Sequence, residues 1–299
     1  MMAGQTAATM TLLDRIAPPL FIFIWATGYI VAKLAAPYAD PLTFLCWRYA
    51  GVVALMLGLA LAARAPWPKP RDMAHLAISG LGIQALYLAG VWVSIRQGLP
   101  AGTAALIVNL QPVLVAALAP LIGERVLPRQ WLGVALGLAG VVLVIWHKLT
   151  LGASFGPPLL LCLMALLAIT GGTLYQKRFV PHFDLRTGQV VQFAAALLAT
   201  LPVAWLTEPM RIEWNASVGV AMAWSVLVLT AGGISLMFYM LRHGRVTAVS
   251  STMYLVPSVT SVMAWLLFGE TLGAQAIVGM GVTLLGVYLV VAKKTETPG

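Results

Sequence analysis

The chain has 299 residues, of which 61% are hydrophobic and 9% are charged, whereas about 25% are charged in an ordinary soluble domain. This composition, with a mean hydropathy of +0.92, excludes a soluble globular protein, because a core of this size cannot enclose so much apolar surface. The net charge of +9 does not indicate nucleic-acid binding, since the basic residues are spread over short connections between apolar runs and form no patch.

Ten apolar runs follow one another along the chain, separated by proline, glycine and charge clusters. Each is close to the roughly 20 residues that a helix needs to cross the hydrocarbon core, and only helices satisfy their backbone polar groups internally in lipid. The first run exceeds the roughly 7–15 residues of a signal-peptide core, so we expect it to be a retained span. The expected spans are 16–36, 41–62, 74–96, 101–121, 129–147, 157–176, 185–206, 217–241, 246–268 and 274–292.

The second half of the chain repeats the first. An offset of 144 residues aligns identical residues around the first and sixth spans, and an offset of 146 does so around the fourth and fifth spans and the ninth and tenth. Two such units predict an all-α integral membrane protein with ten transmembrane helices in two five-helix repeats, residues 1–150 and 151–299. The aligned pairs are Gly28/Gly172, Lys33/Lys177, Pro37/Pro181, Asp40/Asp184, Gly98/Gly244, Gly123/Gly269, Glu124/Glu270, Gly133/Gly279 and Gly140/Gly286.

Lysine and arginine residues concentrate at one end of the expected spans. This asymmetry predicts a multi-pass protein of the inner (cytoplasmic) membrane with both termini cytoplasmic. Because each repeat has an odd number of spans, the second repeat must be inverted relative to the first. The cytoplasmic ends carry Arg15, Arg64, Lys69, Arg71, Arg125, Arg129, Lys177, Arg178, Arg186, Arg242, Arg245, Lys293 and Lys294, and the outer ends carry Lys33, Arg96, Lys148 and Arg211.

The order of these features resembles the EamA-type, ten-helix branch of the drug/metabolite transporter superfamily, over essentially the whole chain. The resemblance rests on Gly123-Glu124 and Gly269-Glu270, each after a proline-containing span, on the glycine-rich spans that follow them, and on Pro41 and Arg48 in the second span. The overall character is similar to YddG-like amino-acid exporters. The resemblance implies a central cavity formed mainly by spans 1, 3, 4, 6, 8 and 9, with spans 5 and 10 at the periphery.

Polar and aromatic residues recur at helical spacing on several of these spans. Gln84 and Tyr87 share one face of the third span, and Tyr254 and Ser258 share one face of the ninth. An amide without a partner is costly in lipid, which favours a cavity position for Gln84, whereas hydroxyl stripes also serve helix packing, so both interpretations stay open for Ser258. The candidate substrate-binding and cavity residues are Trp25, Tyr29, Gln84, Tyr87, Asn109, Thr170, Tyr175, Tyr239, Tyr254 and Ser258.

Arg48 is the charged residue that lies clearly inside an expected span. An intramembrane charge is a functional hypothesis by default. Its counterpart in the second repeat is Gln192, however, and its position near the start of the span allows snorkelling to the outer interface. Substrate contact and the tethering of backbone carbonyls are therefore two open interpretations.

Helix-weakening residues lie near the middle of three spans. Pro112 and Pro257 each remove a helix hydrogen bond and produce a bend, and Gly171 and Gly172 make the sixth span more pliable. We predict that these positions serve gating, with chance placement as the alternative.

The acidic residues and histidines exclude several chemistries. None of the nine acids lies in the middle of a span, although proton-driven transporters usually keep an intramembrane carboxylate. The four histidines show no metal-ligand spacing and no phosphate-binding loop is present. We therefore expect no catalytic residues, no metal, no cofactor and no nucleic-acid partner.

Together these observations predict a secondary transporter that exports small neutral or zwitterionic metabolites, most of all amino acids, including aromatic ones, by uncoupled alternating access. Its partners are a small-molecule substrate and the lipid bilayer, and one chain contains both halves, which is compatible with a monomer. A multidrug antiporter for organic cations would need a buried carboxylate, and a nucleotide-sugar exchanger would need several basic residues in the cavity. A membrane-embedded enzyme is the weakest alternative, because every loop is short.

Overall fold

The computed structural model describes residues 12–118, 120, 126–150, 156–242, 255–270 and 273–291, and these residues form helices joined by short connections. One isolated antiparallel bridge joins Ala39 to Ile212. The helices are α1 (Leu12–Ala35), α2 (Pro41–Ala62), α3 (Pro70–Gly80), the π-helical segment η1 (Leu81–Leu86), α4 (Tyr87–Arg96), α5 (Ala101–Val108), α6 (Gln111–Leu118), α7 (Pro128–Thr150), α8 (Gly156–Phe179), α9 (Leu185–Thr207), α10 (Ala216–Ala223), the π-helical segment η3 (Trp224–Gly232), α11 (Gly233–Arg242), α13 (Val256–Phe268) and α14 (Ala274–Val291).

These helices confirm the predicted fold class. Six are long and apolar enough to cross a membrane by length and composition, and four further apolar helices are shorter. The third span runs through α3, η1 and α4, the fourth is divided into α5 and α6, and the eighth runs through α10, η3 and α11. Residues 246–254 of the expected ninth span lie outside the described residues.

Local sequence explains where several helices begin. Pro41, Pro70 and Pro128 each open a helix, where the missing proline N–H costs no hydrogen bond. Asp184 caps α9, because its carboxylate accepts a hydrogen bond from the Arg186 N–H at 2.9 Å. The Arg186 side chain also donates to this carboxylate, which lowers the pKa of Asp184. Asp184 is therefore a charged cap of α9 at neutral pH.

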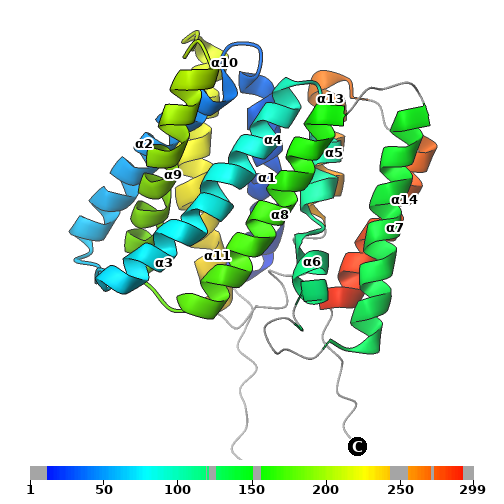
Figure 1. Ribbon diagram of the computed structural model, residues 1–299, viewed down its shortest axis with the longest axis horizontal. Coiled ribbons are helices and arrows are strands. Elements are labelled where there is room, and N and C mark those ends of the chain that lie inside the picture. The colour runs from blue at the N-terminus through cyan, green and yellow to red at the C-terminus, as the bar shows by residue number, and fades with distance from the viewer. Residues whose placement is uncertain are drawn as a thin grey trace, which may run out of the picture.

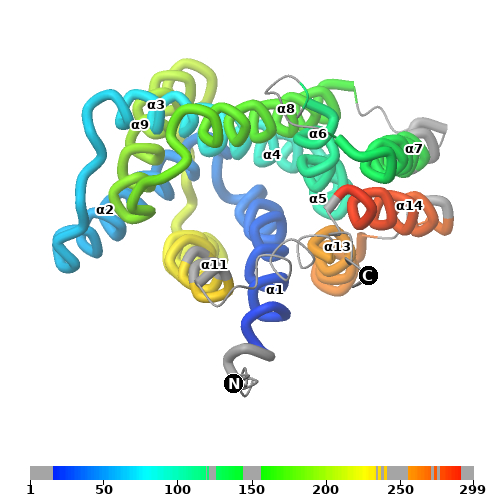
Figure 2. The backbone as a smooth tube through the Cα atoms, turned by 90° about the horizontal axis from the view of Figure 1, so that it is seen from below, coloured from blue at the N-terminus to red at the C-terminus, as the bar shows by residue number. Residues whose placement is uncertain are grey.

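The described start of α1 and the described end of α14 lie on the same side of the bundle (Figure 1). We call the face at which α1 ends and α2 begins the Lys33 face, and the opposite face, at which α8 ends and α9 begins, the Asp184 face. Figure 2 shows α7 and α14 side by side at one edge, away from α2 and α9. A Cβ added to Gly133 would lie 2.6 Å from the Gly286 carbonyl oxygen, so glycine lets α7 and α14 approach closely.

The two π-helical segments are an unpredicted symmetric feature. Leu81–Leu86 lies in the third span and Trp224–Gly232 in the eighth, and their starts are 143 residues apart, one residue from the 144-residue offset of the repeat. Such segments are insertions into α-helices that often occur at functional sites. Periodicity alone does not predict them, because a single-turn widening leaves the apolar character of the span unchanged.

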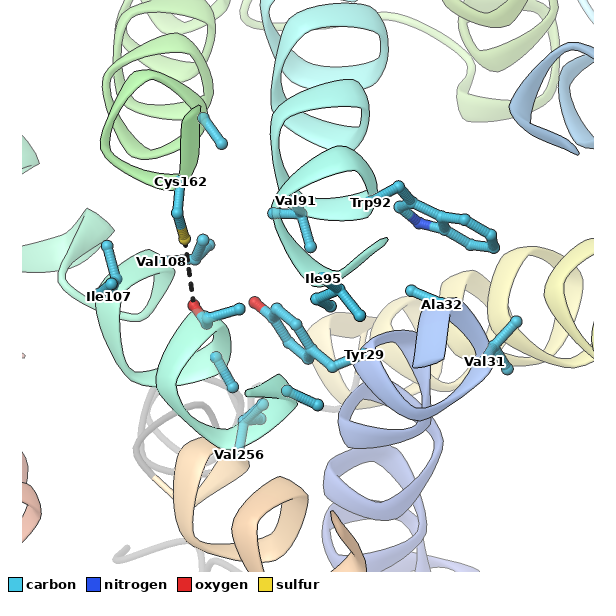
Figure 3. Close-up of a cluster of buried hydrophobic side chains, with 14 of the residues drawn as sticks. Tyr29, Val31, Ala32, Val91, Trp92, Ile95, Ile107, Val108, Cys162 and Val256 are labelled. Carbon is cyan, nitrogen blue, oxygen red and sulfur yellow. Dashed lines mark hydrogen bonds between the residues drawn. The ribbon is translucent and has the colours of Figure 1, made fainter. Parts of the chain in front are cut away.

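The centre of the bundle is packed around α1, α4 and α5. Figure 3 shows Tyr29 of α1 pointing toward α4 and α5, with Val91 and Ile95 of α4 nearby. The Tyr49 hydroxyl donates to the Gln84 carbonyl oxygen at 2.7 Å, which fixes α2 against η1. Gly80 lies against the backbone of Gln192, and a Cβ there would meet the Gln192 Cα at 2.7 Å. The contact between Gly80 and Gln192 brings the first and second halves of the chain together.

Helices α2 and α9 are tied together at both membrane faces. At the Lys33 face the Glu208 carboxylate accepts hydrogen bonds from the Leu42 N–H (2.9 Å), the Thr43 N–H (2.8 Å) and the Thr43 hydroxyl (2.8 Å). At the Asp184 face the Thr187 hydroxyl donates to the Pro66 carbonyl oxygen at 2.9 Å. Thr43 and Thr187 are equivalent under the repeat, so the two faces connect α2 and α9 through equivalent threonines.

We expect Glu208→Ala to destabilise the protein, because three donors at the start of α2 lose their acceptor. Losses of about 1–3 kcal/mol are typical for such charged caps and hydrogen bonds. Thermal unfolding in detergent measures the change. Glu213→Ala is the matched control, since Glu213 pairs with Arg211 on the exposed surface of the same face, where ion pairs contribute little. Equal melting temperatures for the two variants would contradict the capping role.

Candidate functional site

A cavity of about 270 Å³ lies between the two halves of the bundle. It is surrounded by α1, α2, η1, α4, α8, α9 and η3, with both π-helical segments in its wall. Its lining residues are Trp25, Gly28, Tyr29, Arg48, Ile83, Gln84, Tyr87, Leu88, Val91, Trp92, Ile169, Gln176, Phe183, Leu185, Gln189, Gln192, Phe193, Leu229 and Thr230.

The cavity extends unequally toward the two faces. At the Asp184 face it is bordered by Phe183 and Leu185, which lie where α8 ends and α9 begins. Toward the Lys33 face it ends at Trp92, which is 5% exposed and stacks on the fully buried Phe44 with ring centroids 4.6 Å apart. The cavity therefore reaches the Asp184 face and is closed toward the Lys33 face.

Contacts between helix ends keep the Lys33 face closed. The Lys33 Nζ lies 3.3 Å from the Glu270 carboxylate, which also accepts a hydrogen bond from the Ala101 N–H at 3.2 Å. Gly269 ends α13 in the left-handed conformation, with φ of 67°, and this turn returns Glu270 over the helix end. Glu270 thus joins α1 and α5 of the first half to α13 of the second.

Aromatic rings form much of the cavity wall. They are contributed by the first, third and seventh spans: Trp25, Tyr29, Tyr87, Trp92 and Phe193, with Phe183 in the connection at the Asp184 face. Tyr29 is buried and interacts with Tyr87 through its side chain. The Trp224 indole N–H donates to Thr27 at 2.8 Å and so fixes α1 against η3 beside the cavity. Such a wall suits a flat apolar group.

Four glutamines add polar groups to this apolar wall. Gln192 Nε2 donates to Gln176 Oε1 at 2.6 Å and to Ser79 Oγ at 3.1 Å, so these two amides hold each other in place. Gln84 and Gln189 also border the cavity. The Gln189 Oε1 atom is buried and, among the described residues, has no hydrogen-bond partner.

Arg48 brings a positive charge into the cavity wall. Its side chain is 8% exposed, and its guanidinium carbon lies 6.0 Å from the centre of the Phe193 ring. The buried Nε has no hydrogen-bond partner in the described part of the chain. No Asp or Glu belongs to the described lining of the cavity.

The structure brings together five of the predicted site residues, Trp25, Tyr29, Arg48, Gln84 and Tyr87, in the cavity wall. Their contact with a substrate stays a prediction. The candidates on α2 and η1 share the cavity because the Tyr49–Gln84 hydrogen bond holds these two elements together, and Tyr87 follows η1 directly at the start of α4.

Other predicted site residues lie outside this cavity. Asn109 donates to the Ala105 carbonyl oxygen at 2.7 Å where α5 ends, and buried Thr170 donates to the Leu166 carbonyl oxygen at 2.6 Å. The Tyr175 hydroxyl lies 2.9 Å from Nδ1 of His75. Tyr239 packs beside a small cluster on α1 and α11, and Ser258 is half-buried on α13.

Tyr254 lies outside the described residues. No described residue of the fourth or ninth span belongs to the cavity lining, in contrast to the arrangement that the resemblance implies. A direct packing contact accounts for this: Gly102 of α5 lies against Ser261 of α13, and the Thr260 hydroxyl donates to the Ala26 carbonyl oxygen at 3.3 Å.

The predicted gating residues have different surroundings. Pro112 is the second residue of α6, directly after the break that follows α5, and Pro257 is the second residue of α13. Gly171 and Gly172 lie within the uninterrupted helix α8, where a Cβ on Gly172 would meet the Ile83 side chain at 2.8 Å. The role of all four in gating stays a prediction.

Sequence reasoning did not predict the contribution of α9. Leu185, Gln189, Gln192 and Phe193 recur at intervals of three and four residues and face the cavity together. Two signals were present: this helical spacing, and the equivalence of Gln192 with Arg48 under the repeat. Of the described residues, no group of three or more His, Cys, Asp or Glu could hold a metal ion.

Comparison with known proteins identifies the family. The profile of the EamA-like transporter family matches residues 20–146 and again residues 156–292. The uncharacterized inner membrane transporter YedA of Escherichia coli is 24% identical over 275 residues, which cover 92% of this chain and 89% of that protein. A probable amino-acid metabolite efflux pump of Salmonella typhimurium is 23% identical over 282 residues, covering 90% and 92%. A solved crystal structure with 17% identity and a TM-score of 0.65 covers 95% of this chain and 99% of its own, and shows the same fold.

Proposed function

Because the chain belongs to the EamA-like transporter family, we propose that it exports small neutral or zwitterionic metabolites, foremost amino acids with apolar or aromatic side chains. The single observation that carries this proposal is the cavity between the halves, which combines aromatic rings with amide groups and contains no carboxylate among its described lining residues. An organic cation would find no counter-charge there. The name of the Salmonella relative, an amino-acid metabolite efflux pump, agrees with this substrate class.

The volume of the cavity also favours small substrates. Pockets for drug-sized ligands span about 300–1,000 Å³, and this cavity of about 270 Å³ lies just below that range. A nucleotide sugar would require more room and further basic groups for its phosphates. An amino acid matches both the size and the mixed apolar and polar lining.

The orientation of the protein follows from the positive-inside asymmetry of its sequence. With both termini cytoplasmic in an inner membrane, the Asp184 face is cytoplasmic and the Lys33 face is external. The cavity then reaches the side from which an exported substrate enters. Transport requires a second conformation in which the external contacts separate, as in alternating access between inverted repeats.

We expect transport to be uncoupled from protons. In proteoliposomes with equal concentrations of a labelled amino acid on both sides, an imposed pH gradient should cause no net accumulation, because no acid among the described residues lines the cavity to carry a proton. Counterflow of label against excess unlabelled amino acid should occur in the same vesicles. Uphill accumulation that disappears with a protonophore would refute uncoupled transport, and the absence of counterflow for all amino acids would refute the substrate class.

A further inference from the structure

Arg48 is a buried cation that has no counter-ion among the described residues. It is more than nine-tenths buried, and in the described part of the chain it has neither a hydrogen bond nor an ion pair beyond the distant Phe193 ring. A charge in a low-dielectric interior is costly unless it is paired. Arg48 lines the cavity and does not lie at the membrane interface, so an anionic group bound in the cavity could pair with its charge.

The acids of the described chain do not provide that partner. Asp184 is engaged by Arg186, Glu208 by the start of α2, and Glu270 by Lys33. These three lie at helix ends, and neither they nor the other acids whose side chains the structure describes, Asp40, Asp72 and Glu213, line the cavity. The positive charge of Arg48 is therefore available to a ligand.

Gln189 supplies the complementary group. Its Oε1 is buried and without a partner in the described structure, and an amide oxygen can only accept hydrogen bonds. Gln189 lies one helical turn before Phe193, the ring over which the Arg48 guanidinium lies, so the two groups border the same part of the cavity. The pair combines one cationic donor with one neutral acceptor.

We propose that Arg48 binds the carboxylate of the transported molecule and that Gln189 accepts a hydrogen bond from its ammonium group. This inference rests on the proposed function and narrows it to substrates with a free carboxylate beside an N–H donor. A single guanidinium matches one negative charge, and the aromatic wall then holds the side chain. Arg48 thus selects by charge, while the rings select by shape.

Three probes with the same phenyl group test this assignment by thermal stabilisation of the purified protein. They are L-phenylalanine, L-phenylalaninamide, which lacks the carboxylate, and 3-phenylpropionate, which lacks the ammonium group. We expect phenylalanine to bind the wild-type protein at least about 10-fold more tightly than either analogue, as charge-assisted hydrogen bonds imply.

The variants separate substrate contact from a structural role. In Arg48→Gln, which introduces the residue of the second repeat, the preference for phenylalanine over its amide should fall below about 3-fold, whereas Arg48→Lys should keep it. In Gln189→Leu the preference for phenylalanine over 3-phenylpropionate should fall, while the preference for phenylalanine over its amide should remain. Lys69→Gln, which removes an exposed charge at the Asp184 face, should change neither preference.

Three results would overturn the inference. The first is equal binding of phenylalanine and its amide to the wild-type protein, and the second is that no free amino acid stabilises it. The third is that Arg48→Gln weakens the binding of all three probes equally while Gln189→Leu binds them as the wild-type protein does. Charge-selective binding without counterflow would instead refute the proposed transport function and leave the binding assignment intact. The two failures are therefore distinguishable.

Discussion

Gly286→Ala is expected to cause a large loss of stability for the addition of a single methyl group. An added Cβ would lie 2.6 Å from the Gly133 carbonyl oxygen, and the neighbouring atoms belong to the backbone of α7, which cannot move aside as a flexible side chain would. The two helices would have to separate along their whole interface. We expect a loss of about 1–3 kcal/mol or more, measured as a lower melting temperature and a smaller monodisperse fraction in detergent.

Gly281→Ala is the matched control on the same helix. A Cβ at Gly281 would have no atom within 4 Å, and alanine has a higher helix propensity than glycine. We expect the melting temperature of this variant to equal or exceed that of the wild-type protein. Equal destabilisation by the two substitutions would show that α7 and α14 do not depend on close glycine contact.

Removing the Glu270 carboxylate is expected to shift the protein toward the conformation that is open at the Lys33 face. Glu270→Ala removes both the ion pair with Lys33 and the acceptor for the Ala101 N–H. These contacts join the two halves only at that face, so their loss, about 1–2 kcal/mol, should change the ratio of conformations by roughly 5- to 30-fold.

Labelling of a single cysteine measures this shift. Ser261→Cys, with Cys46 and Cys162 replaced, reports on the α5–α13 contact, because Ser261 is 2% exposed and faces Gly102. A membrane-impermeant thiol reagent added at the Lys33 face should label the cysteine at position 261 faster when Glu270→Ala is present than when Glu270 is retained. Glu213→Ala removes an exposed carboxylate of the same face and should leave the rate unchanged. Identical rates in all three backgrounds would refute the role of Glu270.

Within the candidate site, three of the predicted residues that line the cavity share one property. Trp25, Gln84 and Tyr87 are large polar or aromatic groups near mid-span, where burial against lipid is unfavourable and a cavity or a partner is needed. Thr170 has the same polarity, but its hydroxyl is satisfied by the Leu166 carbonyl oxygen of its own helix. Whether a hydroxyl is satisfied locally depends on its rotamer, and sequence spacing does not reveal it.

The sequence by itself determined the ten helical crossings and their internal repeat. Span length and apolar character are local properties, and lipid leaves the backbone no alternative to the helix. Only the tertiary structure decided that α9 enters the cavity wall and that the π-helical segments η1 and η3 lie in it. It also decided that Arg48 faces the cavity with no counter-ion from the part of the chain that the structure describes. These features depend on which helix faces meet across more than a hundred residues of chain. That choice is made by close packing, such as Gly80 against Gln192 and Gly102 against Ser261, since packing and interhelical hydrogen bonds, more than hydrophobicity, select the partners of helices in lipid.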